Sequence, residues 1–407
     1  MDNLLIVCDY FYPDIASTGQ LLTELCLELQ DYFNISVIAS VPSLQKDKYQ
    51  SDINYEKFQN INMYRVKTKY FDKKNKISRI KHVIEYYFSC KNAIKKLEKQ
   101  NIIFTISQPP ILGGLLGLYA KKFHKAKLIY NIQDFNPEQI QAVGYIKSKL
   151  LIYLLRKIDI RTCNNADNII VVGSDMLDTI KKRKIIVDNK ISVVNNWIDE
   201  KSVYPLSCDK VLEFKKKYNL KNKLVFMYSG NIGLYYDLEN IVKVFDKFRY
   251  RKDIVFTFVG DGVKKSEIEK YVINNKIDNV IFIPFQNKED LVYSLNAADV
   301  HLVTNKRGIK GVSVPSKIYG VMAVAKYILG IVESGSEASN LIERSDCGLV
   351  VEPENYEEIY KAVSYIINMK SDERREKGVN GRRYLENNLT KSKSISKYKE
   401  VLFGLSV

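Results

Sequence analysis

The sequence predicts an α/β protein made of two doubly wound domains, each a parallel sheet covered by helices on both faces. Short apolar runs alternate over the 407 residues with stretches whose apolar residues recur about every 3.6 positions. The short runs are apolar throughout, which is typical of parallel strands buried on both faces. Residues 200–223 are polar, charged and free of strand patterns, and a new strand pattern begins at Leu224. This interruption divides the chain into two domains of nearly equal size.

Predicted strands alternate with predicted helices in both halves of the chain. The predicted strands of the first half are LLIVCDY, ISVIAS, INMYRV, IIFTIS, KLIYNI, NIIVVG and ISVVNN. Those of the second half are LVFMYSG, IVFTFVG, VIFIPF, VHLV, YILGIV and CGLVV. Helical patterns between them include residues 20–32, 81–99 and 238–248. We therefore expect an N-terminal domain over residues 1–200, a C-terminal domain over 201–371, and a helical segment over 372–407 that packs back toward the N-terminal domain.

Composition excludes several classes of protein. Apolar residues make up 46% and charged residues 27%, as in a folded globular protein rather than a disordered one. Six scattered cysteines form no CxxC pair, so the sequence predicts neither a zinc site nor a disulfide framework, and a reducing compartment fits best. The apolar stretch 102–120 contains Ser107, Gln108 and a Pro-Pro pair, which favours a buried strand, a turn and a helix over a membrane span. The N-terminus lacks a basic leader and carries Asp9, so it fits a first strand better than a signal peptide.

Loops that follow strands hold the candidate site, because open parallel sheets bind ligands where their strands end. In YSGNIGLYYDLEN, Gly230 and Gly233 follow a strand and precede a helix, which lets backbone N–H groups approach a phosphate. Tight turns also use glycine for backbone reasons alone, so this alternative stays open. Ser17, Thr18 and Gly19 precede the first helix, where they could face an anion or cap the helix.

Two further loops carry charged residues at strand ends. Asp134 and Glu138 lie four residues apart after KLIYNI and suit sugar hydroxyls or an acceptor proton, although carboxylates at helix starts are common. Within residues 304–332, two glycines and the three cations Lys306, Arg307 and Lys310 come before VPSK. Such a basic loop suits a diphosphate, although the cations could also be ordinary solvated residues. The sequence has no GxxxxGK[ST] loop, GxSxG elbow, DxD pair or His/Cys cluster, which disfavours metal-dependent transfer.

These segments occur in the order of a known family. They are YFYPDIASTGQLLTEL, SQPPILGGLLG, YNIQDFNPEQ and ISVVNNWID in the first half, and YSGNIGLYYDLENIV, FVGDG, AADVHLV and GVSVPSKIYGVMA in the second. Over most of the chain the set resembles retaining glycosyltransferase family 4, which has the GT-B fold of two Rossmann-like domains facing each other across a cleft. It is most similar to the branch that builds bacterial surface polysaccharides, including the N-acetyl-L-fucosaminyltransferases.

The resemblance implies a metal-independent enzyme without a cofactor, whose C-terminal domain holds a nucleotide-sugar donor and whose N-terminal domain holds the acceptor. It implies substitution with retention, in which an acceptor hydroxyl attacks the anomeric carbon and the departing diphosphate helps to take its proton. It assigns catalytic roles to Asp134, Glu138 and Lys317. The residues that it assigns to the donor are Gly19, Gly230, Asn231, Gly233, Gly260, Asp261, Arg307, Lys310, Ser316 and Lys317. The residues that it assigns to the acceptor are Ser17, Thr18 and Gln133.

The sequence departs from the family at two places. Many members carry two glutamates eight residues apart, and the matching positions here are Val312 and Gly320. Many also place cations in the phosphate loop, whereas GLYYDLEN contains none. We therefore expect Arg307, Lys310 or Lys317 to neutralise the diphosphate.

The net charge of +16 indicates an acidic partner. Residues 67–127 hold fifteen Lys and Arg against three acidic residues, interleaved with aromatic residues such as Tyr70, Phe71 and Phe88. Basic residues beside aromatic ones suit an anionic lipid surface, with a solvated basic face as the alternative. We expect a cytoplasmic protein, peripheral on the inner face of the plasma membrane, with a lipid-diphosphate-linked glycan acceptor of capsule or O-antigen synthesis and no nucleic-acid partner.

The donor and two alternative functions stay open. The resemblance favours UDP as the nucleotide, and N-acetyl-L-fucosamine is the first candidate for the sugar. A nucleotide-sugar 2-epimerase of the same fold would need no acceptor. A non-enzymatic polyanion-binding protein would account for the charge, although no recognised nucleic-acid module accompanies the cations.

Overall fold

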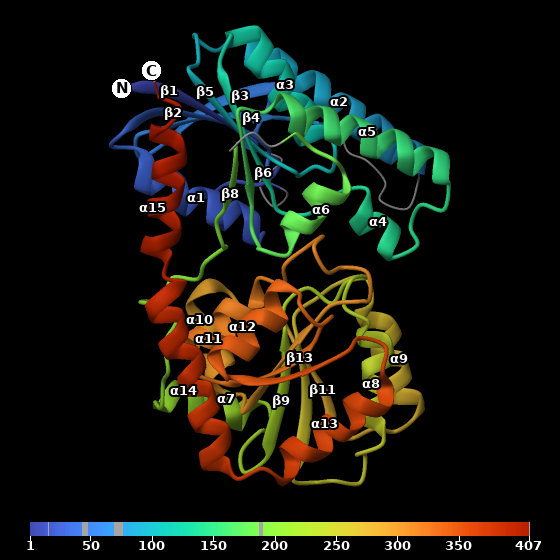
Figure 1. The fold of residues 1–407 in the computed structure, drawn as a ribbon. Coiled ribbons are helices and arrows are strands. Elements are labelled where there is room, and N and C mark those ends of the chain that lie inside the picture. The colour runs from blue at the N-terminus through green and yellow to red at the C-terminus, as the bar shows by residue number, and fades with distance from the viewer. Residues whose placement is uncertain (15, 43–47, 69–75, 187–189, 407) are drawn as a thin grey trace.

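Both halves of the chain form a mainly parallel sheet covered by helices on both faces, which confirms the predicted fold class (Figure 1). The computed structural model describes residues 1–14, 16–42, 48–68, 76–186 and 190–406. The two domains are stacked end to end, and the chain termini lie near each other at the edge of the N-terminal domain. Among the described residues, no helix combines the length and the apolar character that a membrane crossing requires.

The N-terminal domain contains an eight-stranded sheet with the order β3-β4-β2-β1-β5-β6-β7-β8. Neighbouring strands pair in parallel, except that β3 and β4 are antiparallel. The elements of this domain are β1 (Asp2–Val7), α1 (Ser17–Leu29), β2 (Phe33–Ser40), β3 (Ile53–Phe58), β4 (Ile61–Val66), α2 (Lys76–Lys96), β5 (Ile102–Ile106), α3 (Leu112–His124), β6 (Lys127–Ile132), α4 (Glu138–Ala142), α5 (Lys149–Asn165), β7 (Asn168–Val171), α6 (Met176–Lys182) and β8 (Ile191–Val193).

The C-terminal domain contains a six-stranded, wholly parallel sheet with the order β11-β10-β9-β12-β13-β14. Its elements are α7 (Asp209–Lys217), β9 (Leu224–Ser229), α8 (Leu238–Asp246), β10 (Ile254–Val259), α9 (Lys265–Asn274), β11 (Val280–Ile283), α10 (Lys288–Asn296), β12 (Val300–Thr304), α11 (Lys317–Ala323), β13 (Tyr327–Ile331), α12 (Glu337–Ser345), β14 (Gly348–Val351) and α13 (Tyr356–Asn368). Two more helices, α14 (Ser371–Asn388) and α15 (Lys391–Phe403), end the chain.

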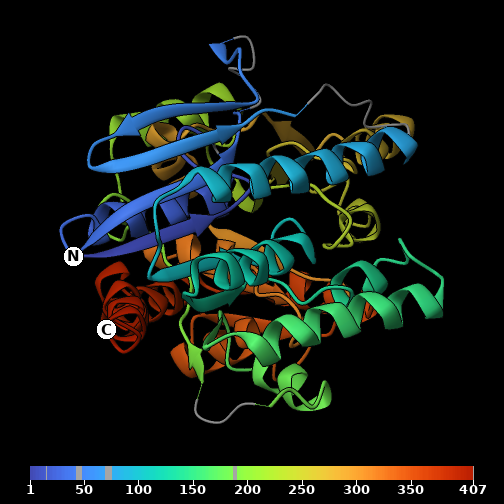
Figure 2. The ribbon, with the colours of Figure 1, turned by 90° about the horizontal axis from the view of Figure 1, so that it is seen from above.

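Apolar layers on both faces hold each sheet in place. In the N-terminal domain, residues of α2 and α3 such as Tyr86 and Leu116 cover one face, and residues of α1 and α15 such as Leu25 and Tyr398 cover the other. Figure 2 shows α2, α3 and α5 running side by side over one face of that sheet. Burying each such side chain contributes about 1.5–3 kcal/mol, so these layers fix the strand ends from which the site loops leave.

Each sheet has one position where the order of strand addition reverses. It lies between β1 and β5 in the N-terminal domain and between β9 and β12 in the C-terminal domain. The loops that follow two such strands diverge at the carboxyl edge of the sheet and leave room for a ligand. They comprise residues 8–14, 16 and 107–111 in the N-terminal domain and residues 230–237 and 305–316 in the C-terminal domain.

The C-terminal segment returns from the C-terminal domain to the N-terminal domain (Figure 1). Arg382 of α14 donates hydrogen bonds to the carbonyls of Val203 and Ala323 at 3.1 and 2.8 Å. In α15, the Tyr398 hydroxyl accepts from the Asn131 amide at 2.5 Å. The sequence pattern reads as one helical stretch, whereas a break before Lys391 divides it into two helices. The break lets the second helix turn onto α1.

The strand pattern missed β3, the antiparallel edge strand. Its residues alternate between half-buried and exposed, and Glu56 and Lys57 lie within it. The apolar runs identify strands that are buried on both faces, such as β10, in which all six residues are buried. An edge strand with one open face lacks such a continuous apolar run. Residues 102–106 and 112–124 form β5 and α3, which confirms a strand, a turn and a helix in place of a membrane span.

Candidate active site

The carboxyl edges of the two sheets face each other, and the loop after β6 contacts the loop that precedes α11. Asp134 forms an isolated antiparallel bridge with Ser313. Next to it, the Phe135 N–H donates to the Val312 carbonyl at 2.9 Å. Predicted site residues from the two domains therefore meet at this junction.

Lys317 begins α11 and places its amine among aromatic rings at the carboxyl end of β9. Its Nζ lies 3.8 Å from the centroid of the Tyr236 ring and 4.6 Å from that of the Tyr228 ring. It also donates to the Tyr228 hydroxyl at 3.1 Å. Burial alone lowers the pKa of Lys317 to about 7, and no carboxylate pairs with it within the part of the chain that the structure describes. An anion beside this amine would favour its protonated form.

The glycines of the predicted phosphate loop lie beside Lys317. Gly230 has φ of 138°, and a Cβ added there would lie 3.4 Å from the Lys317 Cε. Gly260 has φ of 133°, and its added Cβ would lie 2.2 Å from the Gly230 carbonyl oxygen. The Ile232 N–H donates to the Asp261 carbonyl at 2.8 Å. The loops after β9 and β10 therefore pack backbone against backbone, which only glycine permits at the contact.

Three other residues predicted to bind the nucleotide-sugar donor lie near Lys317 and the glycine loop. The Asn231 carbonyl accepts from the Tyr228 hydroxyl at 2.6 Å. A Cβ added to Gly233 would lie 2.7 Å from the Asn231 Nδ2. Ser316 directly precedes α11, is half-buried and makes no capping hydrogen bond with its side chain. Asn231, Gly233 and Ser316 thus belong to the surroundings of Lys317.

Tyr228, Tyr236 and Lys264 are site residues that sequence reasoning missed, whereas Lys306 is one of the three cations of the predicted basic loop. Lys264 and Lys306 each place Nζ 3.1 Å from the same oxygen of Glu239. Burial raises the pKa of Glu239, but hydrogen bonds to backbone N–H and to both lysines outweigh it and lower the pKa. The available signal was the two tyrosines that flank the glycine loop, because cations often lie over aromatic faces.

Arg307 is held by groups of the protein. It donates to the Pro353 carbonyl at 2.9 Å, and its guanidinium lies 3.9 Å from the carboxylates of Glu352 and Glu354. Its side chain is 54% exposed. The structure therefore pairs Arg307 with the segment after β14, and its predicted contact with the diphosphate stays a prediction.

The backbone of the basic loop already binds a carboxylate. The N–H groups of Gly308, Ile309 and Lys310 donate to one oxygen of Glu333 at 2.8, 3.0 and 2.9 Å. The Lys310 Nζ donates to the Ser334 carbonyl at 2.6 Å. Successive N–H groups of this kind form an anion site, and Glu333 fills it here. Of the cations predicted for the diphosphate, Arg307 and Lys310 thus have carboxylate or carbonyl partners.

On the N-terminal side, Gln108 connects Thr18 with Asp134. The Thr18 hydroxyl donates to Gln108 Oε1 at 3.0 Å, and Gln108 Nε2 donates to Asp134 Oδ2 at 3.3 Å. Burial raises the pKa of Asp134, against hydrogen bonds from Ser313 and Gln108 that lower it. Sequence reasoning missed the role of Gln108, although SQPP is one of the segments that carry the family resemblance.

The start of α1 presses against the loop after β1. A Cβ added to Gly19 would lie 3.1 Å from the Tyr10 Cβ, so a side chain there would have to push the loop after β1 away by a few tenths of an ångström. The Thr23 hydroxyl donates to the Gly19 carbonyl at 2.7 Å. Ser17 is exposed at the first position of the helix.

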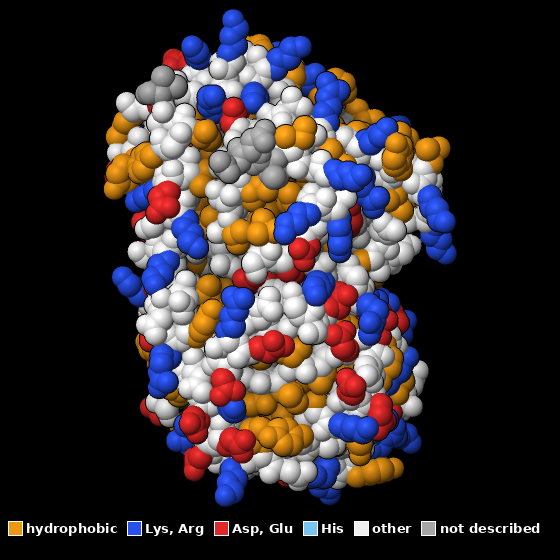
Figure 3. All heavy atoms as spheres, in the orientation of Figure 1, with side chains coloured by type: hydrophobic (Ala, Val, Ile, Leu, Met, Phe, Trp, Pro, Cys, Tyr) orange, Lys and Arg blue, Asp and Glu red, His pale blue; other side chains and the backbone are white. Residues whose placement is uncertain are grey.

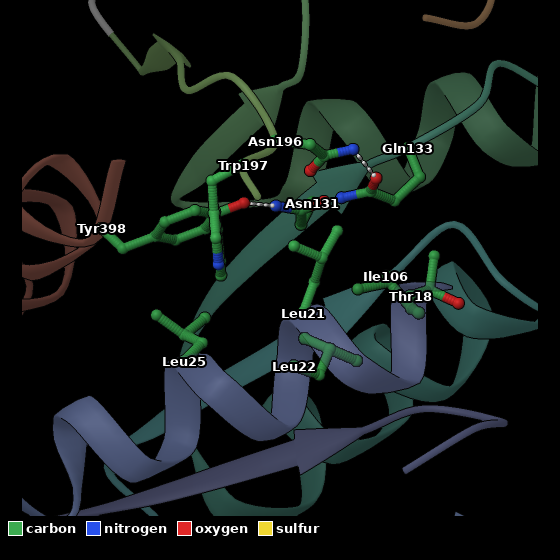
Figure 4. A pocket seen from close by; sticks show the side chains of 10 residues that line it. All are labelled: Thr18, Leu21, Leu22, Leu25, Ile106, Asn131, Gln133, Asn196, Trp197 and Tyr398. Carbon is green, nitrogen blue, oxygen red and sulfur yellow. Dashed lines mark hydrogen bonds between the residues drawn. The ribbon is translucent and has the colours of Figure 1, made fainter. Parts of the chain in front are cut away.

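The Gln133 amide is engaged on both sides (Figure 4). Its Nε2 donates to Asn131 Oδ1 at 2.6 Å, and its Oε1 accepts from Asn196 at 2.8 Å. The adjoining cavity of about 10 Å³ has room for about one water molecule. Its lining residues are Thr18, Leu21, Leu22, Leu25, Ile106, Asn131, Gln133, Asn196, Trp197 and Tyr398. This cavity is too small for a sugar, and the predicted acceptor contact of Gln133 would have to form outside it.

Glu138 lies in a cluster of ion pairs. It accepts from Arg156 at 2.8 Å and from Arg183 at 3.0 Å. Arg183 also pairs with Asp159, and these two side chains are only 2% and 3% exposed. Burial raises the pKa of Glu138, but the hydrogen bond and charge of Arg183 outweigh it and lower the pKa. The two guanidinium groups thus neutralise the Glu138 carboxylate, which holds α4 against α5 and α6. Across the described ranges, no three His, Cys, Asp or Glu side chains gather as metal ligands.

The C-terminal domain matches a family model. Residues 210–384 match the model described as Glycosyl transferases group 1. The chain is 29% identical over 269 residues to a Pseudomonas aeruginosa protein named a probable glycosyltransferase, WbjE. It is 26% identical over 247 residues to WcaI of Escherichia coli K12, whose name assigns it as a glycosyl transferase to colanic acid biosynthesis. These alignments cover 65% and 60% of this chain, and they span the same shares of the two relatives.

Solved structures share the whole architecture. Sucrose-phosphate synthase of Thermosynechococcus elongatus gives a TM-score of 0.78 at 15% identity, with 100% of both chains covered. Anabaena HepE in complex with UDP gives 0.75 at 12% identity, with 99% of this chain and 100% of that chain covered. At such identities the likeness concerns the fold. The chain therefore has the GT-B fold, and its residues 210–384 match the model of the group 1 glycosyl transferases.

Proposed function

We propose that the protein is a retaining glycosyltransferase that moves a sugar from a UDP-linked donor to a lipid-diphosphate-linked glycan, without a metal ion. The observation that carries this proposal is Lys317, an amine without a carboxylate partner among the described residues. It lies beside Gly230 at the reversal point of the C-terminal sheet. An unpaired cation next to backbone N–H groups suits a diphosphate.

The relatives support the substrate classes. HepE is described in complexes with UDP and with UDP-glucose. WaaG, at a TM-score of 0.69 and 14% identity, is described as a glycosyltransferase involved in lipopolysaccharide biosynthesis. WcaI is named for colanic acid biosynthesis. We extend these classes to this chain as a UDP-sugar donor and a lipid-linked glycan of capsule or O-antigen synthesis, with N-acetyl-L-fucosamine as the first sugar to test.

The junction suggests how the reaction proceeds. The bond between the anomeric carbon and the diphosphate oxygen breaks, while the acceptor oxygen forms a bond to that carbon on the same face. The acceptor proton passes to the departing phosphate oxygen. Lys317 and the N–H groups of Asn231 and Gly233 stabilise the charge that develops on the diphosphate. Asp134, which bridges to Ser313 from the opposite domain, holds a hydroxyl of the transferred sugar.

The site of action follows from the acceptor. A lipid-linked acceptor stays in the membrane, so the proposed enzyme works at a membrane surface, for which we propose the cytoplasmic face. The basic stretch 67–127 suits an anionic leaflet. Lys69, Tyr70, Phe71, Lys73 and Lys74 of that stretch lie outside the described residues.

The experiment uses purified full-length protein. A thermal-shift panel of UDP, GDP and dTDP sugars identifies the donor, and a short-chain lipid-diphosphate-linked sugar then serves as acceptor. We expect UDP-sugars to raise the melting temperature and the product to keep the anomeric configuration of the donor. An inverted product would contradict retention. Formation of an epimeric nucleotide sugar without acceptor would identify an epimerase, and tight polyanion binding without any nucleotide effect would identify a binding protein.

A further inference from the structure

Helix α5 leaves large apolar side chains uncovered on one side. Leu150, Tyr153 and Leu154 are 68%, 50% and 47% exposed. Ile152, which points to the opposite side, is buried. Figure 3 shows hydrophobic side chains beside Lys and Arg where α5 lies in Figure 1. Exposed apolar residues that gather in this way mark a surface for a partner or a membrane.

Cations surround these side chains. Residues 144–161 contain five Lys and Arg, of which Arg156 pairs with Glu138, and a single acidic residue, Asp159. Asp159 is buried and paired with Arg183, so its charge does not reach this surface. The Lys157 Nζ lies 4.6 Å from the centroid of the Tyr153 ring. The solvent-facing side of α5 is therefore both apolar and positive.

Helix α2 extends the same surface. Ile84 and Phe88 are 50% and 55% exposed, and the Lys91 Nζ lies 5.7 Å from the centroid of the Phe88 ring. Seen from above, α2, α3 and α5 lie beside one another (Figure 2). We call the outward-facing residues of α2 and α5 named here, together with Lys147 and Lys149, the α2–α5 face.

The α2–α5 face adjoins the domain junction. Helix α4 begins four residues after Asp134, and a short loop joins it to α5. A Cβ added to Gly308, in the C-terminal domain, would lie 3.8 Å from the Cβ of Ala142. Burial and the charge of Asp134 raise the pKa of Tyr235 of the C-terminal domain, and Tyr145, in the loop between α4 and α5, adds to this rise. Whatever binds α5 therefore lies next to the entrance of the proposed active site.

We propose that the α2–α5 face inserts shallowly into a bilayer that contains anionic phospholipid, with the apolar side chains of α5 as the inserted group. This inference rests on the proposed function, because it supplies the surface from which a lipid-linked acceptor reaches Asp134. Interleaved lysines favour lipid headgroups, since protein interfaces are depleted of lysine. A nucleic acid would use the cations but would gain nothing from exposed leucines.

The test compares matched glutamate variants in vesicle sedimentation. Leu150→Glu/Leu154→Glu alters α5, and Leu212→Glu/Ile273→Glu alters two exposed apolar residues of the C-terminal domain. We expect wild type and the control pair to bind phosphatidylglycerol vesicles at low salt, with weaker binding as salt rises and to pure phosphatidylcholine. The α5 pair should bind at least about tenfold more weakly, because burial of each leucine contributes to the affinity. Equal binding of both pairs, or no vesicle binding by wild type, overturns the inference.

A second measurement locates the inserted residue. Tryptophan at Leu154 (Leu154→Trp) should shift its fluorescence to shorter wavelength on phosphatidylglycerol vesicles and be quenched by brominated lipid, whereas Leu212→Trp should not. Both variants must also retain the melting-temperature shift with UDP. An unchanged Leu154→Trp signal contradicts insertion. The vesicle results could be as expected while UDP binds neither the wild type nor any variant. That outcome would support the membrane-binding surface and contradict the proposed transferase function.

Discussion

The amine of Lys317 lies 3.8 Å from the centroid of the Tyr236 ring. An aromatic face stabilises an ammonium by about 0.5–2 kcal/mol, which is less than the desolvation of a buried charge costs. Burial accordingly lowers the pKa of Lys317 to about 7. The aromatic rings hold the amine in position without pairing it with a carboxylate, so an incoming diphosphate can bind it and favour its protonated form.

Replacing Lys317 should abolish turnover without harming the fold. We predict that Lys317→Met lowers kcat by about 100-fold or more, because it removes a group that stabilises charge in the transition state. Its melting temperature should equal or exceed that of wild type, since the variant no longer buries an amine. Lys243→Met, which removes an exposed cation of α8, is the control and should leave kcat unchanged. A Lys317→Met enzyme with wild-type kcat would contradict this role.

Binding of UDP should take up a proton at pH 8. The folded pKa of Lys317 is lowered to about 7, so the free protein holds the amine largely neutral at pH 8. Diphosphate favours the ammonium and raises that pKa, and binding therefore takes up nearly one proton between the two values. At pH 6 the amine is already protonated and contributes no uptake. Calorimetry in buffers of different ionisation enthalpy measures the proton, and equal uptake at pH 8 by Lys317→Met would assign it elsewhere.

Asp134→Asn should separate chemistry from donor binding. The carboxylate lies at the junction, hydrogen-bonded by Gln108 at 3.3 Å. We predict about 100-fold lower kcat with UDP affinity within about twofold of wild type, because the nucleotide contacts the other domain. Steady-state kinetics and UDP calorimetry check the two quantities. A parallel loss of UDP affinity would indicate that Asp134 contacts the nucleotide instead of the transferred sugar.

Glu138→Gln should act mainly on stability. It removes the charge that pairs with Arg183, whose side chain is 2% exposed. Leaving one member of a buried ion pair without its partner costs about 3–5 kcal/mol, although Asp159 retains part of this pairing. Urea unfolding should show a loss toward the lower end of that range, while kcat of the folded fraction changes little. A large fall in kcat at unchanged stability would restore Glu138 to the catalytic group.

Arg307→Ala should have a smaller effect than any change at Lys317. Its side chain is 54% exposed, and its guanidinium lies near two glutamates. Exposed ion pairs of this kind contribute about 0–1 kcal/mol to the free energy of unfolding. We predict a change in kcat/KM of less than about tenfold. A loss equal to that of Lys317→Met would mean that Arg307 leaves Glu352 and Glu354 to bind the diphosphate.

The fold could be predicted because the buried parallel strands are mostly apolar, without alternation between apolar and polar residues. The pattern failed for β3, which has one open face and carries Glu56 and Lys57. Site loops could be found from glycines at strand ends, since Gly230 and Gly260 must approach each other too closely for a side chain. Contacts between residues that lie far apart in the sequence could not be predicted in this way.

The assignment of charged residues shows the limit of sequence reasoning. Lys310 and Lys317 look alike in a basic loop, and only the tertiary structure places Glu333 on the backbone of one and aromatic rings beside the other. Asp134 and Glu138 likewise differ by their neighbours, because Arg183 reaches Glu138 from 45 residues further along the chain. Long-range pairing of this kind leaves no local pattern.

The most direct test of the proposed site is a crystal structure of the full chain with UDP. We predict that a β-phosphate oxygen lies about 3 Å from the Lys317 Nζ and accepts from the N–H groups of Asn231 and Gly233, with no metal between protein and diphosphate. A diphosphate bound on Lys264 and Lys306 alone, or held through a protein-bound metal ion, would contradict it.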